Sequence, residues 1–314
     1  MFWRRRVKKL IIDTDCGIDD AVAIMMAISR KDVDVVGITT VSGNTYVDQV
    51  TDNVLRLLSY FGRKDIPVFK GASVPLIQKL SRGEKIHGEN GLGGVILPET
   101  DKKEETIKAP DAIFKLAKEN EGLIVVTLGP LTNIAMAINL YPELKNYVKE
   151  IVSMGGALET GNVTRFAEFN FYQDPEAVQF VINSGIPMTI VPWDPIVKLM
   201  FLEEEIKAIV PDGSKSGELF LELMKTPINF IEKFYGIRGE VFPDPLTMAY
   251  VIDERVAKKV ILGDMEMELN YTTMRGASIL LEGERLKIVV ELDRDVFVEL
   301  LKETLIDLKG GERE

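Results

Sequence analysis

Short apolar runs alternate with amphipathic segments along most of the chain. The runs have the length and composition of strands that are buried on both faces of a parallel sheet. The segments between them place apolar residues at helical spacing. This order predicts crossover connections and an α/β fold, in which helices flank an open, mostly parallel, Rossmann-like sheet. The predicted strands are 8–12, 33–41, 123–128, 148–154 and 188–191, and the predicted helices between them are 19–29, 46–61, 131–139 and 175–183.

The C-terminal part of the chain is predicted to be mainly helical. Residues 203–210, 217–235 and 244–252 have helical patterns and predict a helical cap region at about 203–253. Residues 286–292 and 293–308 predict a last strand and helix, and the Gly-rich, charged segment 77–106 predicts a long surface loop. No linker-like composition divides the chain, so we expect a single domain over residues 1–314.

Composition removes several classes of protein. Of 314 residues, 46% are hydrophobic and 28% are charged, which excludes collagen-like and disordered chains. The net charge of −11 disfavours nucleic acid as a partner. Cys16 and His87 are the only cysteine and histidine, which excludes a disulfide within the chain and any HExxH metal site. The apolar runs are too short for a signal peptide or a membrane span, so we expect a cytoplasmic protein with no membrane contact.

Four carboxylates fall within eight residues at the end of the first predicted strand. Asp13, Asp15, Asp19 and Asp20 precede a predicted helix, at the sheet edge where open α/β proteins bind ligands. Carboxylates this close repel one another unless a cation lies between them. Oxygen ligands favour Ca²⁺ or Mg²⁺ over zinc. The plainer alternative, a helix N-terminus that complements the helix dipole, accounts only for Asp19 and Asp20.

Other polar segments follow later strands and are predicted to meet at the same sheet edge. Each contains residues that also suit ordinary turns. Asp244 lies between two prolines at a predicted helix start, where an N-cap is the alternative. The segments are 41–45, 127–133, 154–156 with 161–162, and 167–170.

Together these motifs resemble the inosine-uridine preferring nucleoside hydrolase family, whose members are nucleoside N-ribohydrolases that bind Ca²⁺. The resemblance extends from residue 8 to about residue 305. Its most specific part is the DxDxGxDDA motif at residues 13–21. In order, the supporting segments are 43–44, 87–88, 129–133, 154–156, 167–170 with 174–177, and 244–246.

The resemblance implies a role for each matching residue. Asp15, Asp20, Asp244 and the Leu128 carbonyl would bind Ca²⁺, and Asp15 would also act as the base for the attacking water. Asp13 would support the motif without binding the metal directly, and Asn44 would steady the water or the carboxylates. The predicted ribose ligands are Asp19, Asn162, Glu168 and Asn170, with Met154 and Phe169 lining the sugar.

The sequence departs from the family pattern at two positions. Many relatives have a histidine before the last metal-binding aspartate, proposed to protonate the leaving base, and this chain has Pro243. Tyr235 and Arg238 are therefore candidates for contacting the base, and the resemblance places His87 near it as well. Cys16 occupies a position where proline is commoner, and we interpret it as a turn residue.

The leading hypothesis is Ca²⁺-dependent hydrolysis of ribonucleosides to free base and ribose. One alternative is a Mg²⁺-dependent phosphohydrolase of the haloacid dehalogenase kind, whose DxDxT-like opening Asp13 and Asp15 superficially match. The other is a non-catalytic nucleoside-binding protein. The resemblance also implies a homo-oligomer, either a dimer or a tetramer. Base preference is left open.

Overall fold

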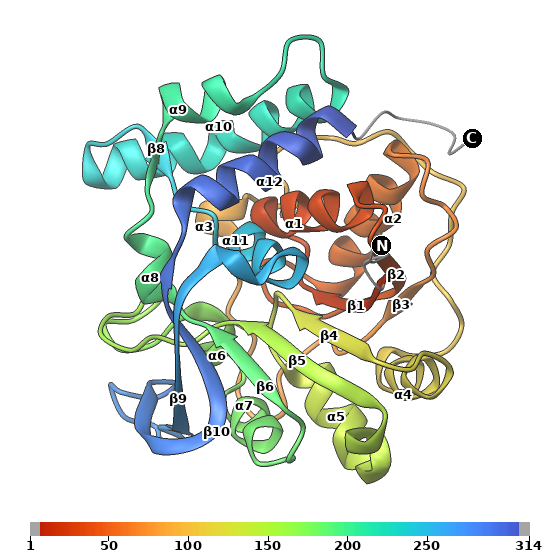
Figure 1. The fold of residues 1–314 in the computed structure, drawn as a ribbon, viewed down its shortest axis with the longest axis vertical. Helices are drawn as coiled ribbons and strands as arrows, with labels where there is room; N and C mark the ends of the chain where they lie inside the picture. Colours follow the sequence, from red (N-terminus) through yellow and green to blue (C-terminus); the bar gives the residue numbers. More distant parts are fainter. Residues whose placement is uncertain (1–6, 308–314) are drawn as a thin grey trace, which may run out of the picture.

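The computed structural model describes residues 7–307, which form one α/β domain around an eight-stranded sheet (Figure 1). The strand order is β3-β2-β1-β4-β5-β6-β10-β9, and all neighbouring strands are parallel except β9 and β10. This confirms the predicted fold class. The strands are β1 (Lys8–Thr14), β2 (Val33–Thr40), β3 (Val68–Lys70), β4 (Leu123–Thr127), β5 (Val148–Met154), β6 (Met188–Val191), β9 (Ala257–Met267) and β10 (Ser278–Leu292).

The inner strands are apolar on both faces because each face carries its own hydrophobic core. In β1, Leu10 and Ile12 point into one core, and Ile11 points into the other. Side chains alternate between the two faces of a strand, so a strand covered on both faces is apolar at every position. The predicted runs 148–154 and 188–191 coincide with β5 and β6 for this reason.

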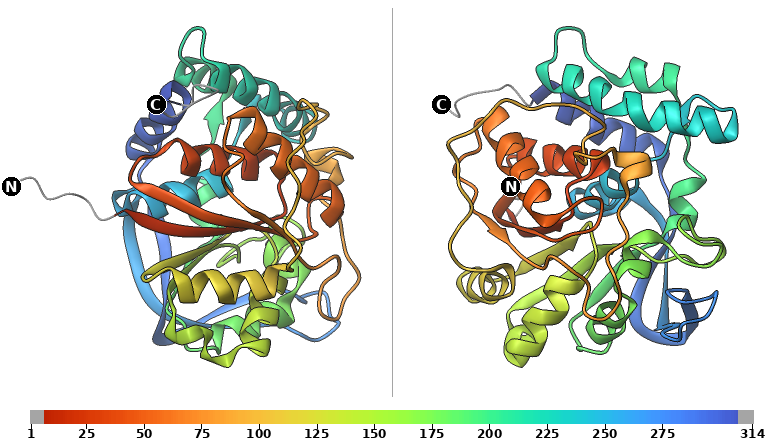
Figure 2. Two further views of the ribbon diagram at one scale, coloured as in Figure 1. Left: turned by 90° about the vertical axis from the view of Figure 1, so that its right-hand side faces the viewer. Right: turned by 180° about the vertical axis from the view of Figure 1, so that it is seen from behind.

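Helices cover the two faces of the sheet in separate layers (Figures 1 and 2). One layer contains α1 (Ile18–Ser29), α2 (Val47–Tyr60), α11 (Pro243–Ile252) and α12 (Arg294–Asp307), with α10 (Lys215–Tyr235) outside them. The other contains α4 (Ala109–Glu119), α5 (Thr132–Leu140) and α7 (Pro175–Ile182). In α1, every residue from Ile18 to Ile28 except Asp19 is buried, so this helix is enclosed on all sides.

The C-terminal part combines helices with a two-stranded sheet and a long hairpin. β7 (Phe201–Leu202) pairs with β8 (Gly239–Glu240), and α11 starts shortly after β8. The predicted strand 286–292 is only the second half of β10, whose first half pairs with β9. The predicted last helix extends to residue 308, which lies outside the described residues. The remaining elements are α3 (Glu84–His87), η1 (Pro142–Asn146), α6 (Phe169–Gln173), α8 (Trp193–Val197), α9 (Glu203–Ile209) and η2 (Glu254–Val256).

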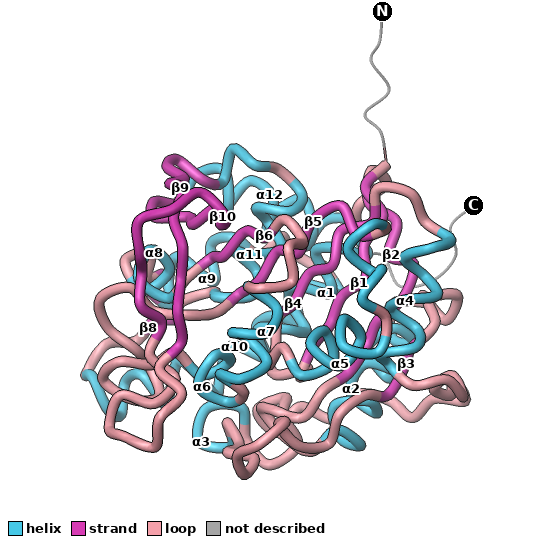
Figure 3. Tube along the Cα trace, turned by 90° about the horizontal axis from the view of Figure 1, so that it is seen from below, coloured by secondary structure: helices cyan, strands magenta, loops and turns pink. Residues whose placement is uncertain are grey.

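The carboxyl ends of the parallel strands share one edge of the domain. Figure 3 shows α3, α6 and several loops at this edge, opposite the end at which β1 begins. α3 lies within the predicted surface loop 77–106. Among residues 7–307, no helix is both long enough and apolar enough to cross a membrane.

Candidate active site

The acidic motif occupies the end of β1, the turn after it and the first turn of α1. Asp13 is in β1, Asp15 follows it, and Asp19 and Asp20 belong to the first turn of α1. The helix dipole favours negative charge at this end of the helix. Asp13, Asp15 and Asp20 are fully buried, and Asp19 is partly exposed.

Hydrogen bonds to the Asp20 carboxylate stabilise the turn. Its two carboxylate oxygens accept the Thr14 hydroxyl and, at 2.8 Å, the Gly17 backbone N–H. Cys16 has a φ of 26°, an uncommon conformation for a residue other than glycine. Burial raises the pKa of the Cys16 thiol well above its usual value, so the thiol stays protonated. This environment agrees with a turn residue.

Asp244 joins the motif from a distant part of the sequence. It lies in the first turn of α11 and is buried. One carboxylate oxygen each from Asp19, Asp20 and Asp244 lies within 4.8 Å of the others. The structure therefore brings Asp19, Asp20 and Asp244 together, and Asp15 is not one of these three.

Burial and mutual repulsion raise the pKa values of this cluster. The pKa of Asp20 is raised to about 7, first by burial and then by the charge of Asp19. Burial also raises the pKa values of Asp15 and Asp244 well above their usual range, and neighbouring aspartates add to the effect. Within residues 7–307, no lysine or arginine forms an ion pair with Asp15, Asp20 or Asp244.

Asp13 lies behind the cluster and links three elements. Its Oδ1 accepts hydrogen bonds from the Thr39 hydroxyl and, at 2.8 Å, from Asn133 Nδ2. Burial raises its pKa to about 7. These contacts join β1 to β2 and α5, as expected for a supporting residue.

Asn44 bridges two of the carboxylates from the end of β2. Its backbone N–H donates to Asp15 Oδ2 at 2.7 Å, and its Nδ2 donates to Asp20 Oδ2 at 3.2 Å. A Cβ on the preceding residue, Gly43, would lie 2.0 Å from Asp15 Oδ2. Glycine is required there because the backbone approaches Asp15 so closely.

The Leu128 carbonyl, at the end of β4, faces Asn170. Asn170 Nδ2 donates to it at 2.7 Å and lies 3.3 Å from Met154 Sδ. A Cβ on Gly129 would lie 3.0 Å from Asp15 Oδ1, which places this segment against Asp15. Leu128, Met154 and Asn170 thus meet beside the acidic cluster.

Glu168 caps α6 and also binds the backbone that follows β5. Its carboxylate accepts the N–H groups of Asn170 at 2.8 Å, Gly156 at 2.9 Å and Phe171 at 3.1 Å. Burial raises its pKa to about 7, and the charge of Asp19 adds to the rise. Glu168 therefore lies on the same side of the domain as Asp19.

Asn162 and Phe169 lie farther toward the surface. Asn162 Oδ1 accepts the Phe169 backbone N–H at 2.9 Å. Asn162 is exposed and Phe169 is partly buried. The contact holds the loop before α6 over the region where Glu168 and Asn170 lie.

His87 contacts the start of α1. Its Nδ1 accepts the Ile18 backbone N–H at 3.1 Å and lies 3.9 Å from Asp19 Oδ1. Burial lowers its pKa, so the imidazole is neutral near pH 7 and carries its proton on Nε2. The structure thus places His87 beside the acidic cluster.

Tyr235 and Arg238 lie elsewhere. Tyr235 ends α10, and its side chain is 72% exposed. Arg238 forms ion pairs with Glu203 and Glu232 on the surface. No contact in the described part of the chain joins either residue to the acidic cluster.

One buried carboxylate was missed by the sequence analysis. Glu240, in β8, is partly buried, and its Oε2 is fully buried without a hydrogen-bond partner. Its position between Gly239 and Val241, four residues before Asp244, carries no recognisable motif. Only the fold reveals its environment.

The cluster fits a hard divalent cation. Asp15 Oδ1 and Asp19 Oδ1 are buried without a hydrogen-bond partner, and buried carboxylates are costly unless they are paired or bind a metal. The available donors are all oxygens, which Ca²⁺ and Mg²⁺ prefer. Asp15, Asp20, Asp244 and the Leu128 carbonyl could hold such an ion, and Asp19 is close enough to take part.

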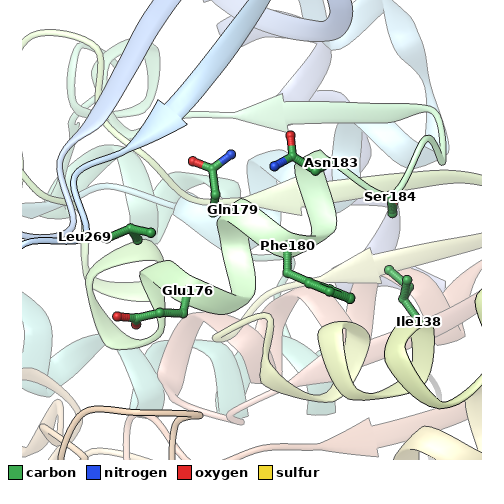
Figure 4. A pocket seen from close by; sticks show the side chains of 7 residues that line it. All are labelled: Ile138, Glu176, Gln179, Phe180, Asn183, Ser184 and Leu269. Carbon is green, nitrogen blue, oxygen red and sulfur yellow. The ribbon is translucent and has the colours of Figure 1, made fainter.

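A pocket lies on another side of the molecule. Figure 4 shows it between α5 and α7. None of the predicted site residues lines it. The lining residues are Ile138, Glu176, Gln179, Phe180, Asn183, Ser184 and Leu269.

The chain is similar to known proteins along nearly its whole length. Residues 10–299 match the model of the inosine-uridine preferring nucleoside hydrolase family. The pyrimidine-specific ribonucleoside hydrolase RihA of Citrobacter koseri is 35% identical over 305 residues, covering 94% of this chain and 97% of RihA. An uncharacterised protein of Schizosaccharomyces pombe is also 35% identical, over 95% of this chain and 98% of its own length.

Solved structures show the same fold. A plant nucleoside hydrolase superposes with a TM-score of 0.90 at 31% identity, covering 95% of this chain and 99% of the plant chain. A purine-preferring ribonucleoside hydrolase from Gardnerella vaginalis also gives a TM-score of 0.90, at 30% identity, with 96% and 99% coverage.

Proposed function

Since the chain belongs to the inosine-uridine preferring nucleoside hydrolase family and is a nucleoside hydrolase, we propose that its acidic cluster holds Ca²⁺ and that ribonucleosides are hydrolysed there to free base and ribose. The observation that carries this proposal is the approach of Asp19, Asp20 and Asp244 to within 4.8 Å with no balancing lysine or arginine among the described residues. Ca²⁺ suits the site because it accepts six to eight oxygen ligands in flexible geometry, whereas Mg²⁺ demands an octahedron.

In this proposal Asp15 is the general base. Asn44 holds its Oδ2, while its Oδ1 has no protein partner and is free to accept a proton from water. A bound divalent cation supplies Lewis acidity, which lowers the pKa of a bound water. The carboxylates nearby also stabilise the positive charge that develops on the sugar.

We propose that Asp19 and residues beside the cluster hold the ribose. Asp19, Asn162, Glu168 and Asn170 supply hydrogen-bonding groups for its hydroxyls, and Met154 and Phe169 line it. Support for this arrangement comes from the backbone contacts that fix Glu168 and from the contact of Asn170 with Met154. We propose that His87, which lies beside Asp19, contacts the base. Tyr235 and Arg238 remain sequence-based predictions for contacting the base.

The ribose contacts predict strong discrimination against 2′-deoxyribonucleosides. A deoxy sugar leaves Asp19 and the other polar groups of the proposed ribose site without their partner, and sites built to hydrogen-bond a hydroxyl reject the analogue by about 10⁴-fold. We expect kcat/KM to fall by roughly this factor between uridine and 2′-deoxyuridine, or between inosine and 2′-deoxyinosine. Similar kcat/KM values for the two sugars would refute the proposed ribose site.

The base preference of the enzyme can be measured with a panel of ribonucleosides. One relative is named pyrimidine-specific and a structural neighbour purine-preferring, and we propose that this enzyme acts on ribonucleosides of either or both classes. Released reducing sugar, measured for inosine, guanosine, adenosine, uridine and cytidine, ranks the substrates. Free base and ribose support the proposal, whereas binding without any product from the whole panel contradicts it.

We further propose a cytoplasmic homo-oligomer, a dimer or tetramer, acting in nucleoside salvage. Sedimentation of the purified chain gives its mass in solution. A species of 35.2 kDa at micromolar concentration would contradict the oligomer.

A further inference from the structure

In the carboxyl group of Glu240, one oxygen is fixed by a hydrogen bond and the other has no hydrogen-bond partner. Its Oε1 accepts the Val241 backbone N–H at 2.8 Å, which fixes the carboxyl plane. Its Oε2 is buried without a hydrogen-bond partner. An unsatisfied buried polar atom costs free energy, so its presence at Glu240 calls for an explanation.

The chain connects Glu240 to the acidic cluster, because Glu240 lies four residues before Asp244. Glu240 pairs with Phe201 in the small sheet, and the chain then passes through the buried residues Val241 and Phe242 to Asp244. The charge of Asp19 is close enough to act on Glu240. The free oxygen is thus held on a short, packed connection that ends at the proposed metal site.

Cleavage of a nucleoside leaves an electron pair on the base, which needs a proton. The residues around the cluster offer few donors. Asp15, Asp20 and Asp244 are assigned to the cation, and Asp19 and Glu168 to the ribose. His87 is a neutral imidazole, and its remaining proton, on Nε2, is too weakly acidic to be transferred to the base. Tyr235 and Arg238 lie at the surface, as described above.

We propose, on the basis of the nucleoside hydrolysis proposed above, that Glu240 is the acid that protonates the departing base. As water oxygen bonds to C1′ of the ribose, the C1′–N bond breaks and its electron pair goes to the base. The proton on Glu240 Oε2 moves to the base, and Asp15 takes a proton from the attacking water. Transfer of that proton back to Glu240 through solvent restores both groups, so the net reaction consumes one water.

The environment of Glu240 favours the protonated form of its carboxyl group. Burial raises the pKa of Glu240 to about 8, and the charge of Asp19 contributes to the rise. The carboxyl is therefore mostly protonated at neutral pH. An acid with a pKa near the working pH is well matched to proton transfer.

The test compares Glu240→Gln on two kinds of substrate. Glutamine keeps the size of the side chain, the contact with the Val241 N–H and a hydrogen-bond donor, but it cannot release a proton. A nucleoside needs protonation of its base, whereas p-nitrophenyl riboside has a leaving group that departs as a stable anion. We expect kcat on the best nucleoside to fall by about 10²- to 10³-fold, with KM little changed and p-nitrophenyl riboside hydrolysis within about threefold of wild type.

Three further variants sharpen the result. Glu204→Gln, at an exposed position of neighbouring α9, controls for loss of a negative charge and should behave as wild type on both substrates. Tyr235→Phe and Arg238→Ala test the candidates from the sequence. A selective loss on nucleosides in either of these, and not in Glu240→Gln, would overturn the proposal.

The remaining outcomes are also decisive. Equal loss of activity on both substrates at an unchanged melting temperature would show that Glu240 only shapes the site. No loss on either substrate would show that Glu240 has no part in the reaction. Both outcomes overturn the proposal. If Glu240→Gln does not fold, the same two kinds of substrate are compared with Glu240→Asp, which keeps an acidic group. Failure of the wild-type enzyme to hydrolyse any nucleoside or p-nitrophenyl riboside would instead overturn the proposed function itself.

Discussion

Asp15→Asn is expected to lower kcat on a ribonucleoside by about 10³-fold or more while the protein stays folded. The amide is nearly the same size as the carboxylate, and its oxygen can still accept the Asn44 N–H that Asp15 Oδ2 accepts at 2.7 Å. What is lost is the charge of a proposed cation ligand and the group that accepts the proton from water. Steady-state kinetics with the wild-type enzyme's best nucleoside measure the effect.

A measurement of thermal stability distinguishes this loss of activity from a folding defect. In the metal-free protein, burial and the charge of Asp20 raise the pKa of Asp15. A raised folded-state pKa means that the ionised group destabilises the fold at pH values above its unfolded-state pKa. Removing that charge should therefore leave the melting temperature at pH 7 unchanged or higher in the presence of a chelator.

A control aspartate distinguishes local from general effects. Asp34 is exposed in β2, and Asp34→Asn should keep wild-type kinetics. Turnover of Asp15→Asn close to that of wild type would assign the base to another group.

Removal of divalent cations is expected to abolish activity. The carboxylates of Asp19, Asp20 and Asp244 lie within 4.8 Å of one another, and without a cation they repel each other and leave the water unactivated. Prolonged dialysis against a chelator should reduce kcat to background. Adding Ca²⁺ should restore it, and Mg²⁺ should restore it less well because of its stricter geometry.

The melting temperature gives a second measure of cation binding. A ligand at one hundred times its Kd stabilises the folded state by about 2.7 kcal/mol. We expect Ca²⁺ to raise the melting temperature of the wild-type protein by several degrees and that of Asp20→Asn by less. Full activity in a preparation shown by elemental analysis to contain no metal would contradict the proposed site.

Where both faces of a strand are covered, the sequence predicted the structure closely. β5 and β6 are continuous apolar runs, so their limits could be assigned from composition alone. β9 and the first half of β10 were missed because both faces are exposed over much of their length and carry charged residues such as Lys259 and Glu282. β3 has only three residues, too few to show a pattern.

The acidic site was predictable in part. The spacing of the four acids at residues 13, 15, 19 and 20 drew attention to the end of β1, because four acids in eight residues are unusual directly after a buried strand. That Asp244 would join them could be proposed only from the family resemblance, because 224 residues separate it from Asp20 (244 − 20). Glu240 escaped notice because an isolated glutamate gains significance only from burial.

The enclosure of α1 has a consequence for how the reactive groups are prepared. Because this helix is buried from Ile18 to Ile28 apart from Asp19, it cannot loosen alone without exposing much of one core, so it opens only with cooperative unfolding of the domain. The repulsion between Asp19 and Asp20 is therefore overcome when the chain folds, before any nucleoside arrives. Substrate binding does not have to rearrange these charges, and more of its free energy remains to lower the barrier of the reaction.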